Sequence, residues 1–236
     1  MGGFLWTSIR VAVLGCLLGG LLTHVPAGIA GERVITPDLS RINDGTSWRL
    51  INADSDLSTQ EGKSVVRLKA KGKPNTPSNV GLALVEGVEF AEGTLEIDLK
   101  GRGPVERCFL GVAFNVADGK NFEAVYFRPF NFREGDYSTP THAVQYIAWP
   151  DHTWEKLRKS KPGQYESTVK PVPDPSGWFH ARIEVTKQKV SVWVDDAKEP
   201  SLVVGRLSSR MRGSKVGLWV DSRAGSFRNL KIVPTS

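Results

Sequence analysis

Cysteine is scarce in this chain, and the shortage limits how the fold can be stabilised. Only two cysteines occur among 236 residues, and Cys16 lies inside an apolar run near the N-terminus. If that run is removed, Cys108 is left alone and cannot form a disulfide within the chain. Cys108 stands in an apolar stretch, so we expect a buried thiol. Stability must then come from core packing.

The short motifs that mark common enzyme and metal sites are also missing. There is no phosphate-binding loop, no dinucleotide fingerprint and no Gly-x-Ser-x-Gly elbow. The histidines that follow the leader have no metal-ligand spacing, so we expect no cofactor and no metal centre of zinc type. Calcium remains possible through scattered oxygen ligands, although no EF-hand spacing occurs. The aspartates available for it are Asp118, Asp136, Asp151 and Asp221.

Charge is mildly positive and evenly spread. The chain has 31 lysines and arginines against 25 acidic residues, a formal net charge of +6. The densest basic stretch is short, at 156–161. A nucleic-acid-binding protein usually has a basic stripe on a recognisable module. Since neither is visible, we expect no nucleic-acid partner.

The first thirty residues have the plan of a signal peptide. Arg10 precedes an apolar run at 11–22, and small residues follow it, with possible cleavage after Ala27 or Ala30. The run is shorter than the ~20 residues that a membrane helix needs. We therefore predict that residues 1–30 are a cleaved leader. The mature protein is then expected outside the cytoplasm, periplasmic or secreted, with no stable membrane span after cleavage. The alternatives are an uncleaved anchor and a lipoprotein, since the residues before Cys16 loosely resemble a lipobox.

Residues 31–236 are predicted to form one all-β domain. Glycine and proline separate short segments rich in β-branched and aromatic residues. Strict alternation of apolar and polar residues at 94–100, 178–185 and 189–195 is typical of strands with one buried face. No segment has helical periodicity for more than two turns. The pattern favours a two-sheet antiparallel β-sandwich with jelly-roll topology. A long loop without a clear period is expected at about 150–175.

The strands near the C-terminus carry a family resemblance. The blocks WFHARIEVTKQKVSVWVDD (178–196) and KVGLWVDSRAGSFRNLKI (215–232) resemble the closing strands of concanavalin A-like lectin/glucanase domains. The closest likeness is to the DUF1080 or 3-keto-disaccharide hydrolase domains and to laminin-G-like jelly rolls of exported bacterial proteins. NFEAVYFRPFNF (121–132) looks like exported relatives of that group. Over roughly 45–235, the resemblance implies a jelly roll with a carbohydrate ligand.

Catalytic candidates are few. The Glu-x-Asp-x-Glu motif of laminarinase-like enzymes is incomplete, because Lys100 follows Glu96 and Asp98 where a second glutamate is needed. A lysine cannot supply the carboxylic acid that protonates the leaving oxygen. His180 shares a strand face with charged neighbours, which also fits a solvated surface. The remaining weak catalytic candidates are Glu123, Asp221 and His180.

Sugar-binding candidates gather in the middle of the chain. Sugars offer hydroxyls to arginine and amide side chains and apolar faces to aromatic rings. The predicted ligand-binding residues are Glu123, Arg128, Asn131, Gln145, Tyr146, Trp149, Trp154 and Arg158. The alternative is a packed aromatic core in which Glu123 or Glu134 neutralises Arg128.

Three functions stay open at this point. The first is an exported carbohydrate-binding protein, possibly accessory to glycan degradation, with a glycan or small sugar as partner. The second is a hydrolase acting on a glycoside or a 3-keto-sugar, so whether the chain is an enzyme is undecided. The third is an adhesion or protein-binding module of laminin-G type. Fold alone does not choose among them.

Overall fold

The computed structural model describes residues 1–3, 33–72, 79–101, 108–135, 138–207 and 213–235. The compact unit that carries the sheets is Glu32–Ser236. The predicted leader lies almost wholly outside the described residues, so it stays a prediction. Within the described ranges no helix is both long and apolar enough to cross a membrane.

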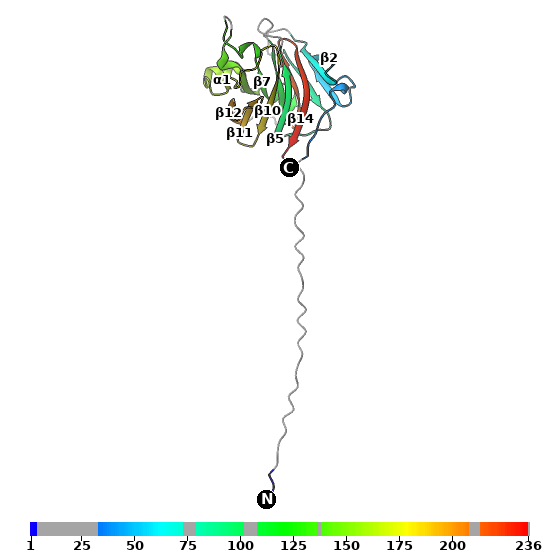
Figure 1. Cartoon of the computed structure of the whole chain (residues 1–236), viewed down its shortest axis with the longest axis vertical. Coiled ribbons are helices and arrows are strands. Elements are labelled where there is room, and N and C mark those ends of the chain that lie inside the picture. Colours follow the sequence, from blue (N-terminus) through cyan, green and yellow to red (C-terminus); the bar gives the residue numbers. More distant parts are fainter. Residues whose placement is uncertain (4–32, 73–78, 102–107, 136–137, 208–212, 236) are drawn as a thin grey trace. The chain divides into compact units, whose positions relative to one another are not determined.

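Two antiparallel sheets of seven strands each form the compact unit (Figure 1). The first sheet has the order β1 (Trp48–Ile51), β4 (Val80–Val85), β13 (Lys215–Asp221), β6 (Phe109–Asp118), β7 (Asn121–Phe127), β8 (Val144–Trp149) and β9 (Glu166–Ser167). The second has the order β12 (Leu202–Gly205), β11 (Lys189–Val194), β10 (Trp178–Val185), β5 (Gly93–Lys100), β14 (Gly225–Pro234), β3 (Lys63–Ala70) and β2 (Ala53–Gln60). The predicted all-β jelly-roll sandwich is confirmed.

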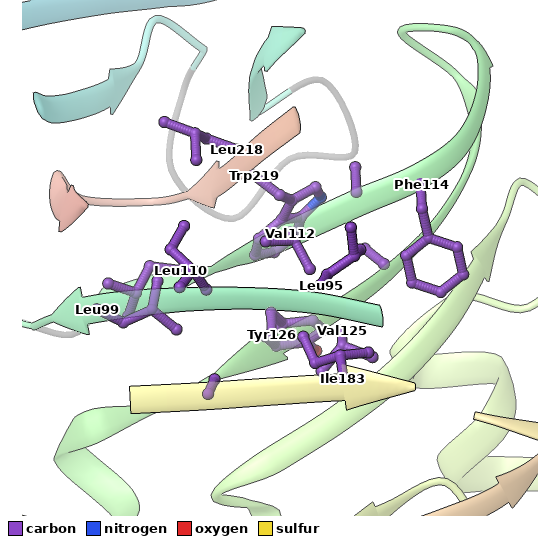
Figure 2. Packing of buried hydrophobic residues seen from close by; sticks show 14 of the residues in the cluster. Leu95, Leu99, Leu110, Val112, Phe114, Val125, Tyr126, Ile183, Leu218 and Trp219 are labelled. Atoms are coloured by element: carbon purple, nitrogen blue, oxygen red, sulfur yellow. The ribbon is translucent and has the colours of Figure 1, made fainter. Parts of the chain in front are cut away.

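Along the strands of the second sheet, every second side chain faces the first sheet. On β5 and β10 the apolar residues are buried and their neighbours only partly so. Figure 2 shows this packing, in which the two sheets contribute Leu95, Leu99, Leu110, Val112, Val125 and Ile183. Each buried aliphatic side chain contributes about 1.5–3 kcal/mol. Cys108 is buried among these residues, as expected.

The central strands of the first sheet are buried on both faces. Every residue of β4 is buried, and so are all but the first of β7 and all but the last of β8. One face packs on the second sheet, and the other is covered in part by the chain between β7 and β10. This double burial explains why these strands show no polar alternation in the sequence.

The segment 150–175, predicted as a long loop, contains two short elements. The helix α1 (Trp154–Ser160) begins after Thr153, whose hydroxyl accepts a hydrogen bond from the amide of Lys156. Strand β9 then pairs with β8 at the edge of the first sheet. Leu157 and Tyr165 are buried, so the segment packs onto the sandwich. Three 3-10 turns complete the described structure, at Leu39–Arg41, Pro129–Asn131 and Pro140–His142.

Candidate functional site

A cleft of about 620 Å³ opens on the outer face of the first sheet. Its size is within the ~300–1,000 Å³ range of ligand sites. Strands β13, β6, β7 and β8 supply the floor, and α1 with the turns that follow β7 supplies the walls. The floor includes Phe109, Tyr126, Ile147, Trp149, Trp219 and Asp221, and the walls include Arg128, Asn131, His142, Trp154, Glu155 and Arg158.

A pair of stacked aromatic rings forms the centre of the floor. The rings of Tyr126 and Trp219 lie 4.6 Å apart with an interplanar angle of 24°. Gly111 of β6 pairs with both residues and lies between them. A Cβ atom there would come within 2.6 Å of the Cα atom of Tyr126, so only glycine allows this close approach.

Arg128 joins the floor to the wall through buried hydrogen bonds. Its Nη2 atom donates to the Tyr126 hydroxyl at 2.7 Å and to Oε1 of Gln145 at 2.6 Å, and Nη1 donates to the His142 carbonyl at 2.8 Å. The Tyr126 hydroxyl donates to the same Gln145 oxygen at 2.8 Å. Burial raises the pKa of Tyr126 to about 12, so the hydroxyl is neutral. The structure thus brings the predicted residues Arg128 and Gln145 together.

Glu166 is the carboxylate that pairs with the two arginines of the cleft wall, Arg128 and Arg158. Arg158 donates to both of its oxygens, from Nε at 3.0 Å and from Nη2 at 2.7 Å. Nη1 of Arg128 lies 3.7 Å from one oxygen, and Nε2 of His142 lies 3.3 Å from the other. The partner of Arg128 is therefore Glu166, and neither Glu123 nor Glu134 takes that place. Sequence reasoning missed Glu166, because the two-residue strand β9 has no periodic signal.

The imidazole of His142 is held toward its neutral form. Burial lowers its pKa, Glu166 opposes that shift, and the nearby guanidinium groups of Arg158 and Arg128 lower the pKa further. Burial, helped by the two guanidinium groups, therefore outweighs the effect of the Glu166 carboxylate on His142.

The other predicted residues of this region also line the cleft. The buried Asn131 accepts a hydrogen bond from the Thr139 amide at 3.1 Å. Trp149 stacks on Phe122 at 5.7 Å. Trp154 is 38% exposed and lies 4.9 Å from the guanidinium carbon of Arg158. An exposed indole on a cleft wall can stack on a sugar ring.

Asp221 provides a second polar end to the cleft. Its Oδ1 atom accepts from Nδ2 of the buried Asn79 at 2.7 Å and from the Ser222 hydroxyl at 3.0 Å. Burial raises the pKa of Asp221 despite these hydrogen bonds. The indole nitrogen of Trp219 and Oδ1 of Asn79 are buried and have no hydrogen-bond partner in the described part of the chain. This end therefore has unused hydrogen-bonding capacity.

Glu123 and Tyr146 lie on the opposite face of the sheet, away from the cleft. Residues at odd positions of β7 point inward, as Phe127 shows by its edge contact with Phe179 of β10. Tyr126 and Arg128, at even positions, point outward. The prediction grouped Glu123 with Arg128 although their spacing of five residues puts them on different faces.

The Glu123 carboxylate lies between the sheets in a closed cluster. It accepts from Nδ2 of Asn115 at 2.6 Å, from the Tyr146 hydroxyl at 2.7 Å and from Nε of Arg206 at 2.9 Å. Arg206 follows β12 of the second sheet and also donates to the Thr186 carbonyl. Asn115 reaches the cluster from a bulge in β6, where its φ is 51°. We call this the interior cluster.

His180 lies on the outer face of the second sheet, so it is not part of the cleft. Its Nδ1 atom is 2.8 Å from Oδ1 of Asp98, and its Nε2 atom is 3.7 Å from Glu96. The hydrogen bond to Asp98 raises the pKa of His180. Arg228 also binds Asp98, at 3.2 Å. The incomplete Glu-x-Asp-x-Lys motif is on this charged face and on a different sheet from the cleft.

The possible calcium ligands are only partly described, so calcium binding stays a prediction. Asp118 accepts from the backbone amides of Lys120 and Asn121 in the β6–β7 turn. Asp136 lies outside the described residues. Among the residues that are described, no group of three or more histidine, cysteine or acidic side chains is placed to hold a metal ion.

Comparison with known proteins gives the fold. No family model and no curated protein matches the chain. Among solved structures, the carbohydrate-binding module CBM66 from Bacillus subtilis aligns with a TM-score of 0.54 and 16% identity, over 79% of this chain and 96% of that one. A native glycosidic hydrolase aligns with a TM-score of 0.53 and 10% identity, over 87% and 97%. The calcium-bound exoplasmic/lumenal domain of VIP36 aligns with a TM-score of 0.51 and 14% identity, over 86% of this chain and 89% of that one.

These neighbours are galectin- and concanavalin-like sandwiches, and the chain has the same fold. At 10–16% identity these likenesses show the fold alone, and the fold agrees with the resemblance to concanavalin A-like domains that the sequence suggested. The narrower likeness to DUF1080 or laminin-G domains stays a prediction.

Proposed function

We propose that this chain is an exported carbohydrate-binding protein and that the sugar occupies the cleft over Tyr126 and Trp219. The observation that carries the proposal is the combination, in one concave site, of the partly exposed rings of Trp149 and Trp154 with planar polar side chains held by buried hydrogen bonds. Aromatic faces stack on the apolar faces of a sugar ring, and fixed polar groups select its hydroxyls. A preorganised site spends less binding energy on ordering its own side chains.

Two further observations support this proposal. Structures with the same fold include a carbohydrate-binding module and a lumenal domain, and the N-terminal sequence has the plan of a signal peptide. A role outside the cytoplasm, accessory to glycan degradation, fits both.

Hydrolysis is the second candidate, because Asp221 lies in the cleft with a raised pKa. A carboxylic acid with a raised pKa can protonate a leaving oxygen, but glycoside hydrolysis also needs a second carboxylate. Glu166 is bound on both oxygens by Arg158. The other carboxylate that lines the cleft in the described structure is the exposed Glu155 of α1. The arrangement therefore favours binding without turnover.

A glycan array on the protein without residues 1–30 tests the proposal, followed by calorimetry on each ligand found. The variant Trp154→Ala should weaken binding about three- to tenfold, since an aromatic stacking contact contributes about 0.5–1.5 kcal/mol. Trp193→Ala is the matched control, because Trp193 packs on Arg182 of the second sheet, away from the cleft. Equal effects of both substitutions, or no binding to any glycan, would reject the cleft as the sugar site.

Product analysis on the same ligands separates the alternatives. Intact sugar after prolonged incubation is the expected result, and cleavage that Asp221→Asn abolishes would establish the hydrolase instead. Binding to a protein partner with no glycan bound would favour the adhesion module.

A further inference from the structure

The cleft has more positive than negative charge around Glu166. Two guanidinium groups, those of Arg128 and Arg158, share this one carboxylate. Arg128 and Glu166 are both at least nine-tenths buried. In the interior cluster, by contrast, one arginine faces one glutamate. A buried charge without a counter-charge is costly, so the second guanidinium in the cleft favours an additional anion.

Arg158 is the cation positioned to meet that anion. Glu166 occupies its Nε and Nη2 atoms, while Nη1 donates to no oxygen of the described residues. Its side chain is 32% exposed and lines the cleft. The guanidinium is held over the Trp154 ring at 4.9 Å, so it is oriented before a ligand arrives.

The acidic residues that line the cleft are Asp221, at the end of β13, and Glu155, on α1. Asp221 accepts hydrogen bonds from Asn79 and Ser222, and burial, with a smaller contribution from the charge of Glu155, raises its pKa. The charges acting on His142 are those of Glu166, Arg158 and Arg128. The cleft therefore has a basic end at Arg158 and a hydrogen-bond-accepting end at Asp221.

We propose that the ligand is an acidic glycan, whose uronate unit places its carboxylate at Arg158 and its hydroxyls toward Asp221. This inference rests on the proposed sugar-binding function and names the class of sugar. A neutral sugar would satisfy the hydroxyl-binding end but would leave Glu166 as the one carboxylate shared by Arg128 and Arg158. A uronate supplies a planar carboxylate for the guanidinium on the same ring that carries the hydroxyls.

The test uses sugars that differ only in charge. Oligogalacturonates and oligoglucuronates are compared with their fully methyl-esterified forms, together with neutral oligomers of glucose and galactose, by calorimetry at low ionic strength. We expect at least one free acid to bind about tenfold more tightly than its ester, because a charge-assisted hydrogen bond contributes about 1.5–3 kcal/mol. Arg158→Gln should remove this preference, so that the variant binds the free acid and the ester with equal affinity.

Arg67→Gln is the matched control. Arg67 is also paired with a carboxylate, that of Asp56, but lies on the second sheet, so this variant loses the same formal charge outside the cleft. Its preference for the free acid should equal that of the parent protein. Equal affinity for acid and ester, or an equal loss in both variants, would overturn the inference while leaving sugar binding intact. Failure to bind any acidic, esterified or neutral sugar would overturn the proposed function itself.

Discussion

Two ion-paired clusters stand back to back on the same two strands. On the inner face of β7 and β8, Glu123 and Tyr146 bind Arg206. On the outer face, Tyr126 and Gln145 bind Arg128. Both clusters combine arginine, tyrosine and a carboxylate, and strand alternation alone decides which residues belong to which. Residue type therefore does not distinguish a structural cluster from a ligand site.

The difference between the clusters lies in closure and charge balance. In the interior cluster the carboxylate of Glu123 receives hydrogen bonds from three side chains and is 1% exposed. In the cleft, Arg158 is partly exposed and brings a second cation to Glu166. A balanced, closed cluster fixes the packing of the two sheets. An unbalanced cluster that lines a cleft is suited to receive a ligand.

The largest expected effect comes from unbalancing the interior cluster. Glu123→Gln preserves shape but leaves Arg206 without its counter-charge between the sheets. Breaking a buried ion pair costs about 3–5 kcal/mol. We expect the lower end of that range, because the Arg206 side chain is 13% exposed. Urea denaturation at pH 7 measures the loss as a lower midpoint with an unchanged m-value.

Glu134→Gln is the control for this substitution, because Glu134 is an exposed glutamate. Its effect should stay within about 0.5 kcal/mol. If the two variants were equally stable, the interior cluster would have no structural role and the contrast with the cleft would fail.

The second prediction separates stability from binding at the cleft. The pKa of Asp221 is raised by burial, so ionisation costs the folded state free energy as the pH rises above 3.8. Asp221→Asn removes that cost and keeps an oxygen to accept from Asn79. At pH 7 the variant should be at least as stable as the parent, yet bind its sugar about tenfold more weakly. Stability gained together with lost function is typical of a ligand site.

Asp118→Asn should behave in the opposite way. The pKa of Asp118 is lowered, mainly by the hydrogen bond from the Lys120 backbone amide and next by the hydrogen bond from the Asn121 side chain. Its ionised form therefore stabilises the fold above the pKa of the unfolded chain, and the substitution should lower stability at pH 7 without changing sugar affinity. A loss of stability in Asp221→Asn at pH 7 would place Asp221 among the structural residues.

The sandwich could be predicted from sequence because burial on one face leaves a period of two. The alternation at 94–100 and 178–185 fixed β5 and β10 almost to the residue. The site was harder to predict, because β7 and β8 are buried on both faces and their alternation is hidden. Glu123 was placed with Arg128 for this reason.

Other residues could not have been found from local pattern. Glu166 pairs with Arg128 across a 38-residue separation through a two-residue strand. Asn115 reaches the interior cluster because a bulge turns its backbone to a positive φ. Arg206 lies 83 residues from Glu123. Such pairings depend on tertiary register, which a single sequence does not display.

The smallest expected effect concerns pH and the charge imbalance at His142. Burial, together with Arg158 and Arg128, lowers the pKa of His142, although Glu166 opposes the shift. As the pH falls below 6.5, His142 therefore takes up a proton in the unfolded chain before it does so in the folded protein, and the folded state loses stability. His180 has the opposite sign: Asp98 raises its pKa, so its contribution is complete below pH 6.5 and is lost as the pH rises through the raised value. Urea denaturation at pH 7.5, 6.5 and 5.5 tests both signs. As the pH falls, the parent should lose stability relative to His142→Gln and gain stability relative to His180→Gln. Adding Arg158→Gln removes one of the cations that lower the pKa of His142 and should reduce the first difference. An unchanged difference would show that Arg158 does not act on His142 and would contradict the sharing of Glu166 by two guanidinium groups that distinguishes the cleft from the interior cluster.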